Sequence, residues 1–229
     1  MATERNEVQE LQQSLKKMPA VYQFITDIAE KVNKFPLLFE IIRTDRGSVK
    51  YHAEKILRIC SESNPRLVYP YFQDVAELLA SPNNFLRWGA INILANLAAV
   101  DDERRFDAVY DQYFEQLNTD SMVAASNVIE NAWKIVRRFP EREPDITQRL
   151  LAVENNTYLN KGKPSSECKN IVLGNVIDSF ARYFSNSQCQ QQMVDFARRQ
   201  LDNSRRTVAR RAAAFLNKFE GQVTTTSNK

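Results

Sequence analysis

Apolar residues recur along this chain at the spacing of one helix face. Each copy of the pattern has a first residue, an adjacent apolar pair three and four positions later, and a further apolar or small residue at the seventh position, so the four lie on one stripe of an α-helix. Five copies occur: Ala53/Ile56/Leu57/Cys60, Ala90/Ile93/Leu94/Leu97, Ala125/Val128/Ile129/Ala132, Leu173/Val176/Ile177/Phe180 and Ala212/Phe215/Leu216/Phe219. Long periodic segments dominate and the alternating runs typical of strands are missing, so the pattern predicts an all-α protein.

The first residues of the five copies, at positions 53, 90, 125, 173 and 212, are 37, 35, 48 and 39 residues apart. Apart from the third, these intervals lie in or near the range of helical-repeat families. The third is longer because it contains the segment NNTYLNKGKPSSE, residues 155–167, whose Gly, Pro and Ser content predicts a loop. Another apolar segment precedes each stripe, so the predicted repeat unit is a helical hairpin.

A hairpin of this length cannot bury both of its faces alone. About five hairpins in residues 35–220 are therefore expected to stack into a right-handed α-α superhelix, or solenoid. Residues 1–34 are expected to cap it with one or two helices, and residues 221–229 to form a flexible tail. A plain helical bundle is the alternative architecture.

Three short motifs carry a resemblance to known repeat families. VKYHAEKIL (residues 49–57), LRWGAINIL (86–94) and VARRAAAFL (208–216) resemble the second-helix signature of HEAT repeats. ILANLA (93–98) is similar to the last-helix signature of armadillo repeats. The resemblance covers most of residues 35–219 and implies a HEAT/armadillo-like scaffold, without specifying its partner.

Asparagines recur at matching positions beside the buried stripe. One row is formed by Asn92, Asn127 and Asn175, and a second row, one helical turn later, by Asn96, Asn131 and Ser179. Because second helices line the concave surface of a solenoid, both rows are expected to face the groove. An amide has donors and an acceptor, so it can bind the main chain of an extended peptide. The alternative is that these amides form hydrogen bonds between neighbouring repeats.

The resemblance to armadillo proteins also assigns roles by position. Such proteins use an asparagine at the position matching Asn96 and Asn131 to hold the peptide main chain. They carry a tryptophan four residues earlier, where this chain has Asn92 and Asn127. Trp88 and Trp133 are the nearby candidates for the missing aromatic contacts, or they pack between hairpins. The predicted partner is a protein or an extended peptide.

A basic segment near the end of the chain supports a second functional class. Its six arginines are Arg198, Arg199, Arg205, Arg206, Arg210 and Arg211. Guanidinium groups suit phosphates and acidic partners, so a nucleic-acid-associated protein is the alternative function. A solvated helix face is the simpler interpretation of the same charges.

Candidate chemistry is sparse. The single histidine, His52, lies within a repeat helix, and Cys60, Cys168 and Cys189 are scattered, so we expect buried free thiols, no metal, no cofactor and no catalytic residue. One enzymatic exception follows from resemblance: DNA alkylation-repair glycosylases use a HEAT-like solenoid of similar size, with an acid and tryptophans in a basic groove. The candidates for those roles are Glu130, Asp178, Trp88 and Trp133.

Charge and hydropathy complete the prediction. The net charge of +3, from 31 basic and 28 acidic residues, is too small to indicate nucleic acid by itself. The first ten residues lack a signal-peptide pattern, and no apolar run approaches the roughly 18 residues of a membrane span. We therefore expect a cytoplasmic, non-enzymatic interaction scaffold that does not enter a membrane, with an oligomeric state that the sequence does not indicate.

Overall fold

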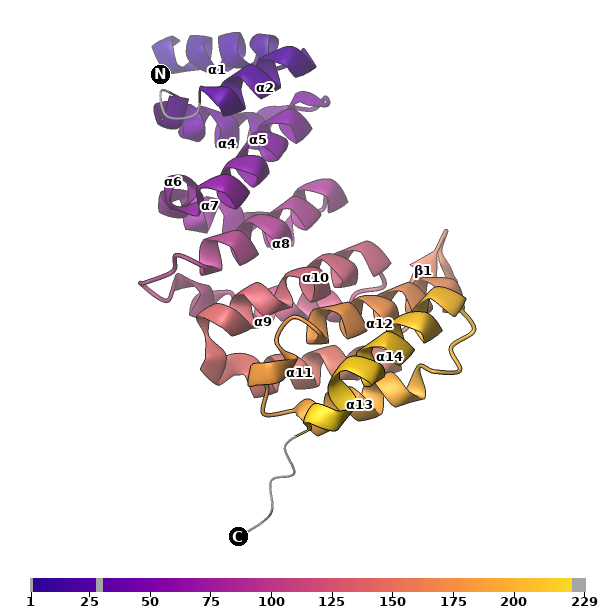
Figure 1. Ribbon diagram of the computed structural model, residues 1–229. Helices are drawn as coiled ribbons and strands as arrows, with labels where there is room; N and C mark the ends of the chain where they lie inside the picture. Colours follow the sequence, from indigo (N-terminus) through magenta and orange to yellow (C-terminus); the bar gives the residue numbers. More distant parts are fainter. Residues whose placement is uncertain (1, 28–30, 224–229) are drawn as a thin grey trace. The chain divides into compact units, whose positions relative to one another are not determined.

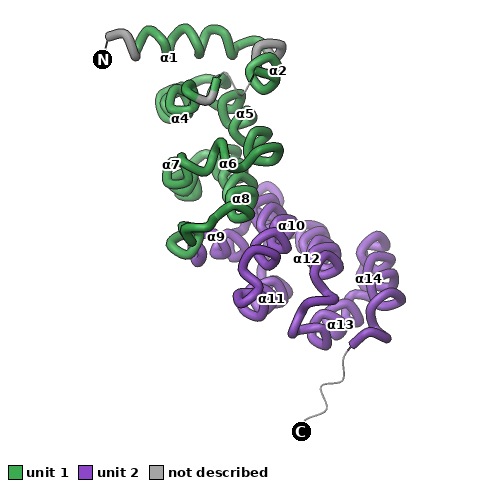
Figure 2. The backbone as a smooth tube through the Cα atoms, turned by 60° about the vertical axis from the view of Figure 1, so that its left-hand side comes forward, with its two compact units in different colours: residues 1–109 green, residues 110–229 purple. Residues whose placement is uncertain are grey.

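The computed structural model describes residues 2–27 and 31–223, and it confirms the all-α prediction (Figure 1). The only strands among these residues are two short ones, β1 (Leu159–Asn160) and β2 (Lys163–Pro164). The chain forms two compact units, residues 1–109 and 110–229, which are described separately (Figure 2). Most of the predicted C-terminal tail, residues 224–229, lies outside the described residues.

Unit 1 contains seven described α-helices and four short 3-10 helices. In chain order these are α1 (Ala2–Ser14), α2 (Met18–Thr26), η1 (Val32–Lys34), α4 (Phe35–Thr44), α5 (Val49–Ser63), α6 (Pro65–Val68), η2 (Tyr69–Tyr71), α7 (Phe72–Glu77), η3 (Leu78–Ala80), α8 (Asn84–Ala98) and η4 (Arg105–Ala108). Helix α5 packs against α2, α4 and α8, so it lies at the centre of this unit.

Unit 2 contains six described α-helices, five short 3-10 helices and the two strands. Its elements are α9 (Tyr110–Glu115), η5 (Gln116–Asn118), α10 (Met122–Arg138), η6 (Pro140–Arg142), α11 (Glu143–Ala152), η7 (Val153–Asn155), β1, β2, α12 (Ser166–Phe180), η8 (Phe184–Asn186), α13 (Gln190–Arg199), α14 (Arg206–Phe219) and η9 (Glu220–Gln222). Helix α12 packs between α10 and α14.

The five apolar stripes form the interiors of the two units. They lie on α5, α8, α10, α12 and α14, and every residue of every stripe is buried. Three of these helices begin at a side-chain cap: Asn83 accepts hydrogen bonds from Phe85 N and Leu86 N, Ser121 from Ala124 N, and Ser165 from Cys168 N. Each cap satisfies backbone donors of the first turn and so fixes where the helix starts.

The helices that precede the stripes are more broken than a simple hairpin requires. Before α8, the chain runs through α6, η2, α7 and η3 instead of one helix. Pro70 lies in η2 and has no N–H to donate, so it interrupts the α-helical hydrogen-bond pattern there. The described residues therefore contain more helical segments than five hairpins would supply, which corrects the predicted count.

Residues 155–167, predicted as a loop, contain regular structure. Strands β1 and β2 pair in antiparallel register, Leu159 with Pro164 and Asn160 with Lys163. The two residues between them, Lys161 and Gly162, have φ values of 51° and 76°, as the tightest hairpin turns require. The preceding Tyr158 is buried and donates a hydrogen bond to Leu117 O (3.1 Å), which anchors the hairpin to the helices.

The prediction of buried free thiols is confirmed. Cys60, Cys168 and Cys189 are all free and buried. Burial raises the pKa of the Cys60 thiol to about 11. Among the described residues, no helix combines the length and the apolar character needed to cross a bilayer.

Candidate functional site

A polar face runs across three helices of unit 2. Helices α10, α12 and α14 lie side by side, with α12 in the middle (Figure 1). Their stripes face the core, which leaves another side of each helix for polar residues. We call this surface the polar face and define it by Ser126, Glu130, Trp133, Asn175, Asp178, Arg182 and Arg211.

Asn175 lies at the centre of the polar face and joins all three helices. Its Nδ2 donates to Ser126 Oγ (3.0 Å) and to Glu130 Oε1 (3.3 Å), both on α10. Its Oδ1 accepts a hydrogen bond from Arg211 Nη1 of α14 at 3.4 Å. This amide therefore serves the contact between neighbouring helices, one of the two roles considered for the asparagine rows.

Gly174 allows α14 to approach α12 closely. A Cβ atom at this position would lie 3.1 Å from Val208 Cγ2 and 3.2 Å from Arg211 Nη1, both on α14. These distances are tighter than ordinary van der Waals contact, so a larger residue would require the side chains of Val208 and Arg211 to shift. The glycine thereby brings Arg211 within reach of Asn175 and of Asp178, whose Oδ2 lies 2.9 Å from Arg211 Nη1.

Two acids and two arginines balance one another on the polar face. Partial burial raises the pKa of Glu130, and the negative charge of Asp178 raises it further, while Arg182 and Arg211 act in the opposite direction. Partial burial also raises the pKa of Asp178, against the same two arginines. The guanidinium of Arg182 lies over the Trp133 ring, 5.2 Å from its centroid, a cation–π contact. The face is thus charged with both signs and half-exposed.

The raised pKa of Glu130 predicts a pH-dependent effect of Glu130→Gln. A carboxyl whose pKa is higher in the folded chain than in the unfolded chain favours folding when protonated and loses that contribution as pH rises through the folded pKa. Glutamine has no charge to bury and can still accept from Asn175. We expect Glu130→Gln to be more stable than the parent at pH 7, with the difference shrinking below about pH 4. Urea unfolding at both pH values measures it, and a constant difference would contradict the assignment.

In unit 1, Asn96 occupies a packing position. It is 9% exposed, and its Nδ2 donates to Ser61 Oγ of α5 at 3.0 Å. The hydroxyl of Ser61 in turn donates to Arg58 O (2.7 Å), so the pair is integrated into α5. The Asn96 amide therefore ties α8 to α5 from inside the unit.

The other asparagines bond within their own helices. Asn92 Nδ2 donates to Trp88 O, Asn127 Nδ2 to Val123 O and Asn131 Nδ2 to Asn127 O, each four residues earlier, at 2.8 to 2.9 Å. Asn131 is 5% exposed, whereas Asn92 and Asn127 are half-buried. The row of Asn96 and Asn131 is thus internal, and the row of Asn92, Asn127 and Asn175 is closer to the surface.

The two tryptophans belong to different units and have different neighbours. Trp88 in α8 contacts Phe85 edge-to-face, with ring centroids 5.2 Å apart. The Trp133 ring contacts the guanidinium of Arg182 on the polar face. Of the four residues proposed by resemblance to glycosylases, Glu130, Asp178 and Trp133 share the polar face, and Trp88 lies in unit 1.

Four of the six C-terminal arginines are engaged in ion pairs. Arg198 binds Asp195 and Glu220, Arg199 binds Glu154, Arg205 binds Glu167 and Arg211 binds Asp178. Arg206 and Arg210 are exposed and form no ion pair with the described residues. All of these acids except Asp195, which shares α13 with Arg198, come from other elements, so the basic segment in the sequence is largely neutralised in three dimensions.

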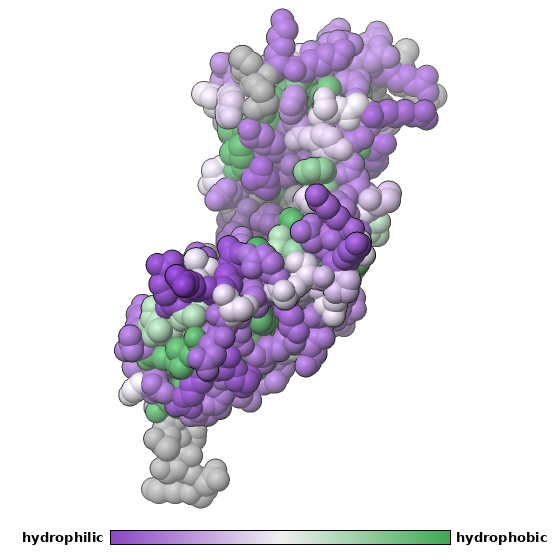
Figure 3. Space-filling model, turned by 90° about the vertical axis from the view of Figure 1, so that its right-hand side faces the viewer, coloured by the Kyte–Doolittle hydropathy of each residue, from purple (hydrophilic) through white to green (hydrophobic). Residues whose placement is uncertain are grey.

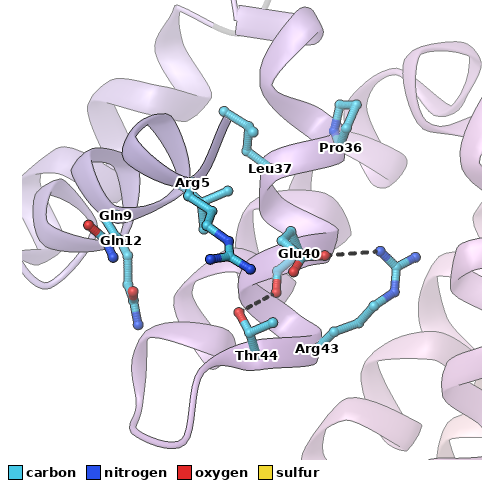
Figure 4. Close-up of a pocket in the computed structure, with 9 residues that line it drawn as sticks. Arg5, Gln9, Gln12, Pro36, Leu37, Glu40, Arg43 and Thr44 are labelled. Carbon is cyan, nitrogen blue, oxygen red and sulfur yellow. Dashed lines mark hydrogen bonds and ion pairs between the residues drawn. The ribbon is translucent and has the colours of Figure 1, made fainter. Parts of the chain in front are cut away.

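Each unit also contains a pocket. In unit 1, a pocket of about 770 Å³ lies between α1 and α4, lined by Arg5, Gln12, Leu37, Glu40 and Arg43 among others (Figure 4). In unit 2, a pocket of about 530 Å³ adjoins Trp133 and Arg182 at the edge of the polar face. The described residues contain no group of three or more His, Cys, Asp or Glu placed to bind a metal ion.

Some residues of the site were missed by sequence reasoning. Nothing in the sequence pointed to Arg182 or Ser126, because their contacts with Trp133 and Asn175 depend on how the helices align. Ser61 could have been identified from the sequence, because it lies 35 residues before Asn96 and the same separation relates Asn96 to Asn131. A serine at the same register as an asparagine could have indicated a hydrogen bond between repeats.

Hydrophilic side chains cover most of the surface visible in Figure 3, and apolar side chains appear there only in small groups.

No family model and no curated protein matches this chain. A solved structure of an engineered protein matches 93% of this chain and 89% of its own, with 14% sequence identity and a TM-score of 0.47. A likeness this distant assigns neither a fold family nor a function.

Proposed function

We propose that the protein is a non-enzymatic, cytoplasmic interaction scaffold of the HEAT/armadillo-like type, which binds a protein partner or an extended peptide on the polar face of unit 2. The observation that carries the proposal is that charged side chains from three successive second helices, Asp178, Arg182 and Arg211 among them, gather on one exposed face. A face of both charge signs suits a polar, extended segment, whose main chain it can bind and whose charges it can pair.

Hydrogen bonds at the repeat spacing support the helical-repeat part of the proposal. Partners in unit 1 include Ser61 with Asn96, 35 residues apart, and Tyr69 with Asp101, 32 apart. Partners in unit 2 include Tyr110 with Asp145, 35 apart, and Asn175 with Arg211, 36 apart. Such contacts join each repeat to its neighbour, which is the pattern expected of stacked repeats.

The proposal divides the polar residues by role. Buried amides, above all Asn96, hold successive helices together. Exposed groups, above all Arg182, Arg211 and Trp133, contact the partner. Trp133 is half-buried beneath a guanidinium, so it offers an aromatic surface next to a charge, a combination enriched at binding hot spots.

Charge reversal on the polar face tests this function. We expect Arg211→Glu to reduce capture of the partner by about tenfold or more in a quantitative pull-down, because it places a third acid beside Asp178 and Glu130. Arg206→Glu is the matched control, since it lies on the same helix, is exposed and forms no ion pair with the described residues. Equal recovery by the parent and both variants would refute the proposed face.

A glycosylase acting on alkylated DNA is the second candidate. It is favoured by the neighbouring acids Glu130 and Asp178 beside Trp133, because a raised carboxyl pKa suits a general acid or base. Release of damaged bases from alkylated duplex DNA by the parent protein would favour this enzyme over the scaffold.

A further inference from the structure

A second surface, in unit 1, combines lysines with aromatic rings, of which Tyr22 and Phe85 are exposed. It spans α2, α5 and α8, of which α5 packs against both others (Figure 1). We call it the aromatic–lysine surface and define it by Tyr22, Lys50, Tyr51, Lys55, Phe85 and Trp88. None of these side chains is used by the polar face, which belongs to unit 2.

The rings and ammonium groups of this surface alternate. Lys55 Nζ lies 3.2 Å from Tyr22 Oη and 4.9 Å from the centroid of its ring. Lys50 Nζ lies 5.4 Å from the centroid of the Tyr51 ring. The Tyr51 and Phe85 centroids are 5.5 Å apart, with Trp88 next to Phe85, so the aromatic contacts continue from α5 onto α8.

Two of these rings are unusually exposed. Phe85 is 64% and Tyr22 is 54% exposed, and the described residues contain one other exposed large apolar side chain, Leu201. Exposed rings this large contribute little to the core, and their clustering on one surface points to a ligand. The rings meet edge-to-face, at 61° for Tyr51 with Phe85 and 66° for Phe85 with Trp88.

The charges of this surface favour an anionic ligand. Neither Lys50 nor Lys55 forms an ion pair with the described residues, unlike four of the six C-terminal arginines. Two acids close to these lysines have other partners: Glu54 pairs with Arg58 and interacts with Lys55 only through its field, and the Asp45 carboxylate accepts hydrogen bonds from Gln12 and from the backbone N–H of Lys50. Lys50 Nζ donates to the uncharged Asp45 O at 3.3 Å. Both ammonium groups therefore lie beside aromatic rings, and neither is in an ion pair with a carboxylate of the described residues.

We infer that the aromatic–lysine surface binds single-stranded nucleic acid. Bases stack on Phe85 and Tyr22, while phosphates contact Lys50 and Lys55. Interleaved rings and basic groups are what sequence-tolerant single-strand binding requires, because every base has a face to stack and every nucleotide a phosphate. A duplex is a poorer ligand, since its bases are already stacked on one another.

The test uses the full chain and a fluorescent oligothymidylate of about 20 nucleotides, a length that spans one such site. We expect binding that weakens as salt rises. Phe85→Leu keeps an apolar side chain but removes the ring, and is expected to weaken binding about 5- to 150-fold. Lys50→Gln with Lys55→Gln is expected to reduce the slope of log affinity against log salt by about 1.4, at about 0.7 per lost phosphate contact. Leu201→Ala is the control, an exposed apolar residue in unit 2.

Several results would overturn this inference. One is the absence of binding at low salt, and another is binding that Phe85→Leu leaves unchanged. A third is equal affinity for a duplex of the same length, which would mean that phosphates alone are recognised. Equal affinity for a polyglutamate peptide would reassign the surface to an acidic protein partner. Loss of binding on Arg206→Gln with Arg210→Gln, with the lysine variant unaffected, would move the site to α14.

Discussion

Asp101→Ala is expected to lower the free energy of unfolding by about 2 to 5 kcal/mol. The side chain of Asp101 is fully buried and accepts hydrogen bonds from Tyr69 Oη (2.6 Å), Arg105 N (2.8 Å) and Phe106 N (2.8 Å). Burial raises the pKa of Tyr69 to about 12, and the bond to Asp101 adds to the shift, so the phenol stays protonated and donates. Alanine would leave three donors without this acceptor.

Urea unfolding followed by circular dichroism measures this loss. Asp102→Ala is the matched control because it removes a neighbouring carboxylate whose side chain is 67% exposed. We expect that control to remain within about 0.5 kcal/mol of the parent. Equal midpoints for the two variants would show that the buried carboxylate does not hold the α8 to η4 connection in place.

Asn96→Ala is expected to cost about 1 to 3 kcal/mol of unfolding free energy, because it leaves a buried cavity and removes the bond to Ser61. A double-mutant cycle with Ser61→Ala isolates the bond itself, and we expect a coupling energy of about 0.5 to 1.5 kcal/mol. Asn217→Ala, an exposed asparagine on α14, is the control. A coupling energy of zero would mean that the amide of Asn96 does not tie α8 to α5.

The fold could be predicted from the sequence wherever a local pattern determines it. The stripe that begins at Ala90 needs only the helical period of about 3.6 residues to mark which side of α8 is buried, and the structure buries all four of its residues. The same holds for the four other stripes. Burial of a helix face is a property of one segment, so it can be recognised without knowing the neighbours.

The same reasoning failed where partners are distant in sequence. Arg199 and Arg205 belong to a sequence segment that contains a single acid, Asp202. They nevertheless pair with Glu154 and Glu167, which come from other elements. Periodicity also could not show that the chain before α8 breaks at Pro70 into short helices. These features depend on how helices align, which one segment does not encode.

The asparagine rows illustrate both outcomes. Their positions could be predicted from the repeat spacing, whereas their roles could not, because an amide at the surface and an amide between helices have the same sequence signature. The structure places Asn96 inside unit 1 and bonds Asn175 to α10 and α14. The proposed partner contacts therefore shift from the amides to the exposed charges around them.

Photo-crosslinking tests the proposed scaffold most directly. A photoreactive amino acid replaces Arg182, which is exposed over Trp133 on the polar face, and in a separate variant replaces Gln192, which is exposed on α13. If the polar face binds the partner, position 182 forms a crosslink to the protein recovered by pull-down and position 192 does not. A crosslink at position 192 without one at position 182 would contradict the account, because the partner would then lie on the other helices of unit 2.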